Sequence, residues 1–281
     1  MTKETLKSTR SRKIVLGQSA AWVALAIMGI FTLFPFFITF ILALSVEGEP
    51  TLPHALPRSL TLDNITRALS SRDLVTWIIN SVTYSLVSTV AVLLLCSMAG
   101  YAFAKKPFPG SNILMWCFLA TLMVPAHVTL IPLFATVSKL GGINTMWGLI
   151  IPTIANSQAV FLMRQFIAGI PDELLESARM DGAGELRIFF QMILPLSKPV
   201  LATVGIFVFL WHWNDFLWPL VVAQSSKART LTVGLASMGT ESASLASTMA
   251  SAAITVIPCL IIFFMLQRYL IRGITAGALK G

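Results

Sequence analysis

Charged residues are scarce in this chain. Aspartate, glutamate, lysine and arginine make up only 11% of the 281 residues, 56% are hydrophobic, and the mean hydropathy is +0.81. Soluble domains usually carry about 25% charged residues. The composition therefore excludes an ordinary soluble fold and predicts an all-α polytopic membrane protein. The net charge of +8 then indicates basic flanks of membrane spans and gives no reason to expect nucleic-acid binding.

Several chemical signatures are also missing. The chain has no G-x-x-x-x-G-K-[ST] loop to hold ATP phosphates, no H-E-x-x-H, and no metal-like group of Cys and His. The three cysteines, Cys96, Cys117 and Cys259, all fall in apolar segments, which argues against a disulfide framework. We expect no catalytic residue, cofactor or metal in this chain, and predict that it is not an enzyme.

Long apolar runs, in contrast, are plentiful. About 20 apolar residues are needed to cross roughly 30 Å of hydrocarbon. The chain offers six such segments: 17–44, 76–104, 112–136, 146–166, 199–223 and 247–271. Pro125 and Pro132 lie in the third, which is expected to bend or break. The external loop 46–74 is expected to end in a short helix that opens near Asp63.

The basic residues predict the orientation of the spans. With the N-terminus inside, fourteen of the 20 Lys and Arg residues fall in cytoplasmic segments or adjoining span ends. The positive-inside rule favours this arrangement, which places both termini in the cytoplasm. The apolar run from Ile14 to Leu44 is also too long for a signal-peptide core of about 7–15 residues.

One charged segment, "PDELLESARMDGAGELRIFFQMILPLSKP" (171–199), lies between two apolar ones. Pro171 suits the first turn of a helix, and Asp172 and Glu173 suit its positive end. Gly182 and Gly184 interrupt the helical pattern before a second helix. The segment is therefore predicted to form a helix, a glycine turn and a helix on the cytoplasmic side.

The charge of this segment indicates what it contacts. Five acids and two bases between residues 171 and 187 give a net charge of −3. Helices that rest on the anionic cytoplasmic leaflet are usually basic. Docking into a protein groove is therefore favoured over resting on the membrane surface, which stays the alternative.

The spacing in this segment resembles the EAA loop of bacterial ABC importer permeases, E-A-A, three residues, G, nine residues, I-x-L-P. Ser177 replaces the second residue and Met192 replaces the Ile. In that family the loop is the coupling helix, which sits in a cleft of the cytoplasmic ATPase. The residues that the resemblance implies in ATPase coupling are Glu176, Ser177, Ala178, Asp181, Gly182, Leu194 and Pro195.

Other stretches extend the resemblance to the maltose-type sugar-importer branch. They are "KKPFPG", "MVPAHVTLIPL", "FLWHWNDFLWPL", "RTLTVGLAS" and "LQRYLIRGITAGALKG". The resemblance implies a type I ABC importer permease fold, with six transmembrane helices and a cytoplasmic coupling helix, in the bacterial inner membrane. The implied partners are membrane lipid, a second permease subunit in a heterodimer, a cytoplasmic ABC ATPase dimer that binds ATP and Mg, and an extracytoplasmic solute-binding protein.

The resemblance also divides the chain. The expected parts are a cytoplasmic tail 1–16, a first transmembrane helix and external loop 17–74, an importer transmembrane domain 75–271 with coupling loop 167–198, and a cytoplasmic tail 272–281. The expected solute is a sugar or sugar derivative, with a non-sugar solute as the alternative.

An ion-coupled carrier is a second alternative, because Asp215 is the one acid placed inside a span. Its neighbours Trp211, Trp213 and Trp218 favour an interfacial, structural role instead. His212 is expected to be a satisfied polar group.

Neutral polar residues at bilayer depth are candidates for a solute pathway. A run at 156–158 lies near the middle of the fourth span, where facing lipid would cost free energy. Either another helix or a water-filled cavity can satisfy such a run, and the sequence leaves both open. The candidate pathway residues are Asn80, Tyr84, Asn156, Ser157, Gln158 and Asn214.

Overall fold

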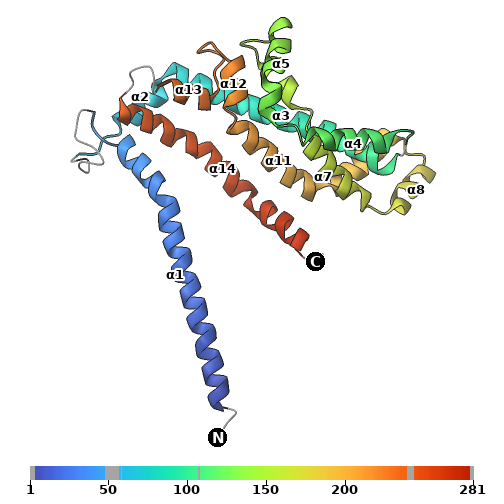
Figure 1. The fold of residues 1–281 in the computed structure, drawn as a ribbon, viewed down its shortest axis with the longest axis horizontal. Helices are drawn as coiled ribbons and strands as arrows, with labels where there is room; N and C mark the ends of the chain where they lie inside the picture. Colours follow the sequence, from blue (N-terminus) through green and yellow to red (C-terminus); the bar gives the residue numbers. More distant parts are fainter. Residues whose placement is uncertain (1–3, 48–56, 58, 107, 239–243, 279–281) are drawn as a thin grey trace. The chain divides into compact units, whose positions relative to one another are not determined.

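The computed structural model describes residues 4–47, 57, 59–106, 108–238 and 244–278 (Figure 1). Within these ranges the regular structure is helical, apart from an isolated β-bridge between Ser45 and Leu60. This confirms the predicted all-α class. The chain forms two compact units, residues 1–68 with 242–254 and residues 69–241 with 255–281, and each is described by itself.

The first unit contains α1 (Glu4–Ala43), α2 (Asp63–Ser70) and the start of α14 (Leu245–Ala278). Asn64 ties α2 to the end of α1, because its Nδ2 donates to the carbonyls of Ala43 (3.1 Å) and Ser45 (2.7 Å). A hydrogen bond from Ser244 is the main cause that lowers the pKa of Glu47. The short helix predicted to open near Asp63 is confirmed as α2.

The second unit is built around α3 (Arg72–Lys105), which packs against α7 (Ser157–Ala168) and α11 (Lys198–Trp213) (Figure 1). Ser71 begins α3 by accepting a hydrogen bond from the Leu74 amide. Gly100 lets α3 and α7 approach closely. A β-carbon at Gly100 would lie 2.8 Å from Met163 Cβ and 2.9 Å from the Arg164 nitrogen.

Proline and short polar stretches break several of the predicted spans. α4 (Ser111–Thr121) and α5 (Ala126–Lys139) are separated before Pro125, which confirms the break predicted in the third span. The fourth span divides into α6 (Met146–Ile150), the 3₁₀ turn η1 (Ile151–Thr153) and α7. Its two parts are bent by 48°. In the fifth, α11 ends at Trp213 and a second helix, α12 (Leu217–Val222), follows; α13 (Leu231–Met238) comes next in the chain.

By length and apolarity, fewer helices of the described residues qualify as membrane spans than the six that the sequence predicts. Among the described residues, Ala21–Ala43 and Asp73–Lys105 are long and apolar enough to cross a membrane as single helices. Two bent pairs, at 146–168 and 185–213, raise this number to four, while Ser111–Thr121 and Leu245–Ile261 are shorter apolar helices. The six predicted apolar segments are thus all helical, but several of them are broken.

Candidate functional site

The segment after α7 forms the predicted hairpin, here defined as residues 171–188. α8 (Asp172–Met180) follows Pro171, and α9 (Glu185–Ile188) follows Gly184. Between them, Gly182 has φ +79°. Its amide donates to the Arg179 carbonyl (3.0 Å), and the Ala183 amide donates to the Ala178 carbonyl (2.9 Å). These two bonds are a Schellman helix end, in which glycine supplies the left-handed residue. A β-carbon at Gly182 would meet nothing within 4 Å, so backbone conformation alone explains the glycine within this chain.

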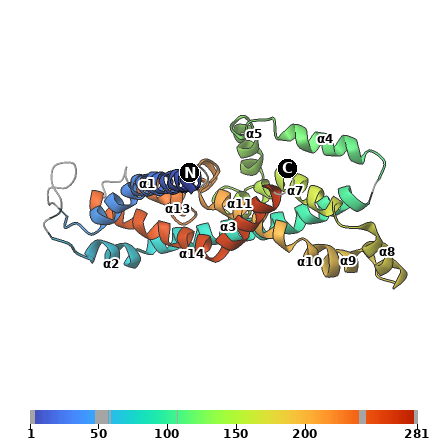
Figure 2. The same cartoon turned by 90° about the horizontal axis from the view of Figure 1, so that it is seen from below.

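A small hydrophobic core fixes the base of the hairpin. Leu175 is 1% exposed and packs with Ile188 and Phe189 against Tyr101 of α3 and Ile167 of α7. The chain continues through the π-helical turn η2 (Phe189–Ile193) and α10 (Leu194–Leu196), and the segment Glu185–Leu196 is bent by 78° from α11. Figure 2 shows α8, α9 and α10 together at one end of the second unit.

The remaining surface of the hairpin carries exposed apolar side chains. Met180 is 88% exposed, Leu186 67% and Leu174 44%. They stand among acidic residues on an element that is otherwise polar. Large apolar side chains exposed on a polar element are candidates for contact with a protein partner.

The residues expected in ATPase coupling fall into two groups. Glu176, Ser177, Asp181, Gly182 and Pro195 are exposed. Ala178 and Leu194 are half-buried and pack against the core of the hairpin base. Within this chain Ala178 contributes to the packing of the hairpin base, and its contact with the ATPase stays a prediction. The sequence analysis did not name Met180 and Leu186 as candidate contact residues. Their apolar side chains fall outside the buried stripe of the hairpin, and this position could have identified them.

The last turn of α3 holds both ends of α8. At the first end, Lys105 Nζ donates to the Ile170 carbonyl (2.5 Å) and to Asp172 Oδ1 (2.8 Å). At the other end, the Glu185 carboxylate accepts hydrogen bonds from Tyr101 Oη (2.7 Å), Arg179 Nε (3.2 Å) and Lys106 Nζ. No sequence motif indicated the contacts of α3 with this segment, because their partners are 65 to 84 residues apart in the chain.

The polar run at 156–158 lies at the start of helix α7, not in the middle of a continuous span. Asn156 is the N-cap of α7, and its Oδ1 accepts a hydrogen bond from the Ala159 amide (2.8 Å). Ser157 Oγ shares a hydrogen bond with Thr121 Oγ1 of α4 (2.7 Å), and Gln158 is exposed. The first two side chains therefore have structural partners, and Gln158 is the one of the three exposed for a pathway role.

The other expected pathway residues also bond locally. Asn80 is buried, and its Nδ2 donates to the carbonyls of Lys227 and Arg229, both at 2.9 Å. Tyr84 is fully buried and donates to Asp215 Oδ2 (2.9 Å), whereas Asn214 donates to the Leu210 carbonyl of its own helix (2.8 Å). Among the hydrogen bonds of the described ranges, none joins these three residues to the 156–158 run, and their role in a pathway stays a prediction.

Asp215 has a structural explanation. Its Oδ2 accepts a hydrogen bond from Tyr84 Oη (2.9 Å), and its backbone carbonyl accepts one from Thr232 Oγ1 (2.7 Å). His212 contacts the Val208 carbonyl through Nδ1 (2.8 Å) and Thr153 Oγ1 through Nε2 (3.1 Å). Both side chains are satisfied inside the protein, which removes the observation that motivated an ion-coupled carrier.

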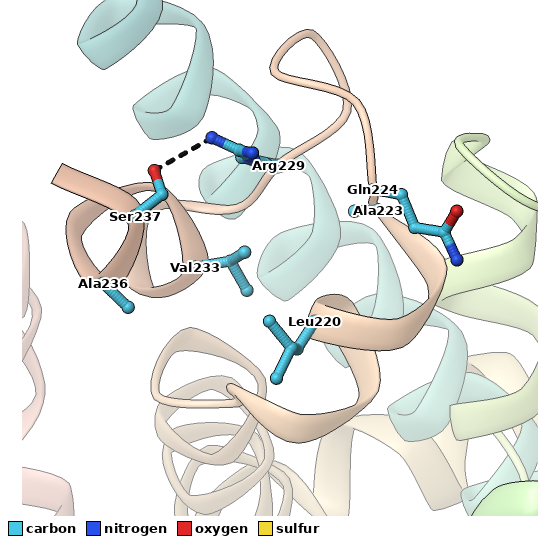
Figure 3. A pocket seen from close by; sticks show the side chains of 7 residues that line it. All are labelled: Leu220, Ala223, Gln224, Arg229, Val233, Ala236 and Ser237. Carbon is cyan, nitrogen blue, oxygen red and sulfur yellow. Dashed lines mark hydrogen bonds between the residues drawn. The ribbon is translucent and has the colours of Figure 1, made fainter. Parts of the chain in front are cut away.

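A hollow of about 430 Å³ lies between α12 and α13 (Figure 3). Leu220 and Val233 line it, and Arg229 Nη1 donates to Ser237 Oγ at its rim (2.9 Å). The adjoining loop 223–230 is pinned to α3 by Asn80 and by Trp77, whose Nε1 donates to the Ser226 carbonyl (2.9 Å). The hollow combines an apolar wall with a cation, and it was not indicated by the sequence.

Comparison with curated proteins identifies relatives in several transport systems. A 42% identical relative is the arabinooligosaccharides transport system permease protein AraQ of Halalkalibacterium halodurans, with 80% of this chain and 81% of that protein covered. The alpha-glucoside transport system permease protein AglG of Rhizobium meliloti is 38% identical, over 80% of this chain and 62% of that protein. The sn-glycerol-3-phosphate transport system permease protein UgpE of Pectobacterium atrosepticum is 35% identical, over 70% and 71%.

A solved structure and a family model agree with these relatives. A chain of a bacterial ABC transporter that imports the acidic polysaccharide alginate has the same fold, with a TM-score of 0.80, 24% identity and coverage of 92% of this chain and 98% of that one. The family described as the binding-protein-dependent transport system inner membrane component matches residues 96–276. The chain therefore belongs to this family and is an inner-membrane permease of an ABC importer.

Proposed function

We propose that this chain forms half of a translocation pathway for a sugar or sugar derivative that a solute-binding protein delivers from outside. The proposal is supported by the names of the relatives, which specify arabino-oligosaccharides, an alpha-glucoside and glycerol 3-phosphate. These solutes are polyhydroxylated. Neutral hydrogen-bonding side chains suit such solutes, and Gln158 stays the exposed candidate of this kind.

The hairpin is the proposed contact with the cytoplasmic ATPase dimer, which binds ATP and Mg²⁺ and supplies the energy. One observation carries this proposal: Met180 and Leu186 project from the hairpin, although its base is packed and hydrogen-bonded. Exposed apolar side chains on a rigid element gain free energy when a partner groove covers them. Glu176 and Asp181 flank them and would face a basic rim. A second permease subunit completes the pathway.

Contact between the hairpin and a cytoplasmic ATPase determines the proposed orientation of the chain in the membrane. The hairpin and both termini face the cytoplasm, in agreement with the distribution of Lys and Arg. Loop 223–230, at the other end of α3, then faces the solute-binding protein.

Docking is tested by co-purification of the ATPase subunit with this chain from membranes. Met180→Ser should release the ATPase while the permease stays in the membrane. Met123→Ser is the matched control, because Met123 is 85% exposed in this chain but lies between α4 and α5. Retention of the ATPase by Met180→Ser together with Leu186→Ser would contradict docking through the hairpin.

The solute is tested on the solute-binding protein that is encoded with this permease. Thermal unfolding of the purified binding protein is followed with arabino-oligosaccharides, alpha-glucosides, glycerol 3-phosphate and, as a non-sugar comparator, methionine. We expect stabilisation by one of the first three classes. Stabilisation by methionine alone would overturn the sugar assignment and leave the permease assignment intact.

A further inference from the structure

Helix α3 meets functional segments at both of its ends. At the Lys105 end, Lys105 holds the start of α8, and Tyr101 and Lys106 hold Glu185 just beyond its other end. The start and the end of α8 are therefore fixed to the same helical turn. A displacement of α8 cannot leave that turn of α3 in place unless these contacts break.

Packing makes the same connection through apolar side chains. Leu175 of α8 and Ile188 of α9 share one buried cluster with Tyr101 of α3. Close packing of this kind transmits displacement, because well-packed interiors have low compressibility. Gly100, one residue before Tyr101, brings α3 against the backbone of α7 with no room for a β-carbon. The hairpin and the adjacent ends of α3 and α7 thus form one mechanical body.

At the Arg72 end, α3 organises loop 223–230. Trp77 Nε1 donates to the Ser226 carbonyl, and Asn80 Nδ2 donates to the Lys227 and Arg229 carbonyls, all at 2.9 Å. Ser81 Oγ accepts a hydrogen bond from the Leu231 amide (2.8 Å), where α13 begins. Three side chains of one helical turn therefore fix the backbone of the loop.

Between these two ends α3 is one uninterrupted α-helix. It has 34 residues and no proline, and it is about 51 Å long at a rise of about 1.5 Å per residue. The neighbouring spans are broken near residues 122–125, 154–156 and 214–216. A displacement at one end of α3 is therefore delivered to the other end, whereas the broken helices can absorb it at their bends.

We propose that α3 is the strut that carries the coupling signal between the hairpin and loop 223–230, and that Glu185 is the positioning residue that engages it. This inference rests on the proposed docking of the hairpin on the ATPase. It goes further, because it names the helix that receives the movement and the side chain that joins it to the hairpin.

Glu185 is assigned this role because its one carboxylate group contacts both the end of α3 and the end of α8. Arg179 belongs to α8, Tyr101 belongs to α3, Lys106 directly follows α3, and Glu185 itself begins α9. The Glu185 side chain is 47% exposed. Exposed ion pairs contribute little to folding stability, so replacing Glu185 should loosen the connection without unfolding the permease.

The test uses the assembled transporter, purified with its partner subunits from cells that make a chain whose three native cysteines are replaced by serine. A fluorophore is attached at Asp73→Cys, an exposed position in the first turn of α3. ATP, Mg²⁺ and orthovanadate are added, and the change in emission is recorded together with ATPase co-purification. No transported solute is needed for this measurement.

We expect a change in emission in the reference protein. Glu185→Gln should reduce it by about fivefold or more, the range of typical allosteric couplings, while the ATPase still co-purifies. Glu185→Asp, which keeps the charge, should restore part of the response. Asp63→Asn is the control outside the hairpin: Asp63 is exposed in the first turn of α2 and loses the same charge, and the response should persist.

The possible results separate this inference from the proposed function. An unchanged response in Glu185→Gln and in Tyr101→Phe, with the ATPase retained, overturns the strut and leaves docking intact. Failure of the ATPase to co-purify even with the reference protein overturns docking and, with it, the strut. If Glu185→Gln releases the ATPase, Tyr101→Phe decides, since it removes only a hydroxyl of α3. If Tyr101→Phe loses the change in emission while the ATPase still co-purifies, the proposed role of α3 is supported. If the ATPase is released in both Glu185→Gln and Tyr101→Phe, that role is overturned.

Discussion

Lys105 and Lys106 are consecutive in the sequence, yet their ammonium groups hold opposite ends of the hairpin helix α8. Lys105 contacts Asp172 at its start, and Lys106 contacts Glu185 beyond its glycine turn. Successive residues of a helix point in different directions, and the chain leaves α3 at this point, so the two side chains can diverge. The Lys105 side chain is 6% exposed, whereas that of Lys106 is 40% exposed. The Lys105 side chain is therefore covered at the hairpin base although its partner Asp172 is 71% exposed, whereas both side chains of the Lys106–Glu185 pair are open to water.

Gly182 should be sensitive to any side chain, and Gly184 should not. Both have space for a β-carbon, but φ is +79° at Gly182 and −72° at Gly184. Placing alanine in the left-handed region costs about 1–2 kcal/mol. Gly182→Ala should therefore weaken ATPase co-purification, and Gly184→Ala should leave it near the reference level. Equal behaviour of the two variants would show that the backbone conformation of the turn does not matter for docking.

The proposed orientation predicts opposite accessibility for two exposed positions of the second unit. In a chain without its native cysteines, Lys227→Cys should react with an impermeant thiol reagent added to intact cells. Arg187→Cys should react only after the membrane is opened. Arg187 is chosen over Gly182 because its helical backbone tolerates cysteine. Labelling of Arg187→Cys from outside intact cells would reverse the topology.

Asn156 should behave as a helix cap. Asn156→Leu removes the acceptor for the Ala159 amide and should lower stability by about 1 kcal/mol, whereas Asn156→Asp keeps an acceptor. Thermal unfolding in detergent and uptake should fall together in the Leu variant and recover in the Asp variant. Loss of uptake in Asn156→Asp without loss of stability would instead indicate direct contact with the solute.

Asn80 should control the accessibility of loop 223–230. Asn80→Leu removes the donor of two hydrogen bonds to backbone carbonyls and should lower stability by about 1–3 kcal/mol. Trypsin cleaves after Lys227 and Arg229, so the variant in membranes should be cut faster at these sites. Asn214→Leu is the control, because Asn214 bonds only within its own helix among the contacts described above. Unchanged cleavage in Asn80→Leu would mean that the other contacts are enough to hold the loop.

Asp215 should tolerate asparagine but not leucine. The carboxamide oxygen of asparagine can still accept the hydrogen bond from Tyr84, whereas leucine would leave the buried tyrosine hydroxyl without it. Asp215→Asn should therefore keep most of the uptake, and Asp215→Leu should lose folded protein. Complete loss of uptake in Asp215→Asn, together with sensitivity of the reference protein to uncouplers, would restore the ion-coupled carrier.

The sequence determined the features that depend on composition and on local spacing. Scarce charge and long apolar runs specify membrane helices, because a span must satisfy its backbone groups internally. Pro125 predicted a break, and the glycine turn of the hairpin was readable from Gly182 and Gly184. Each of these signals acts within a few residues of the chain.

Tertiary structure decided which side chains work together. Tyr101 and Glu185 are 84 residues apart in the chain, and Asn80 and Lys227 are 147 apart. It also gave Asn156 a capping role where the sequence suggested a polar run inside a span. Helical periodicity relates a residue only to neighbours three or four positions away, so it carries no information about a partner on another helix. Packing of α3 against α7, α11 and α13 brings these partners together, and for that reason the hairpin was predictable while its attachment to α3 was not.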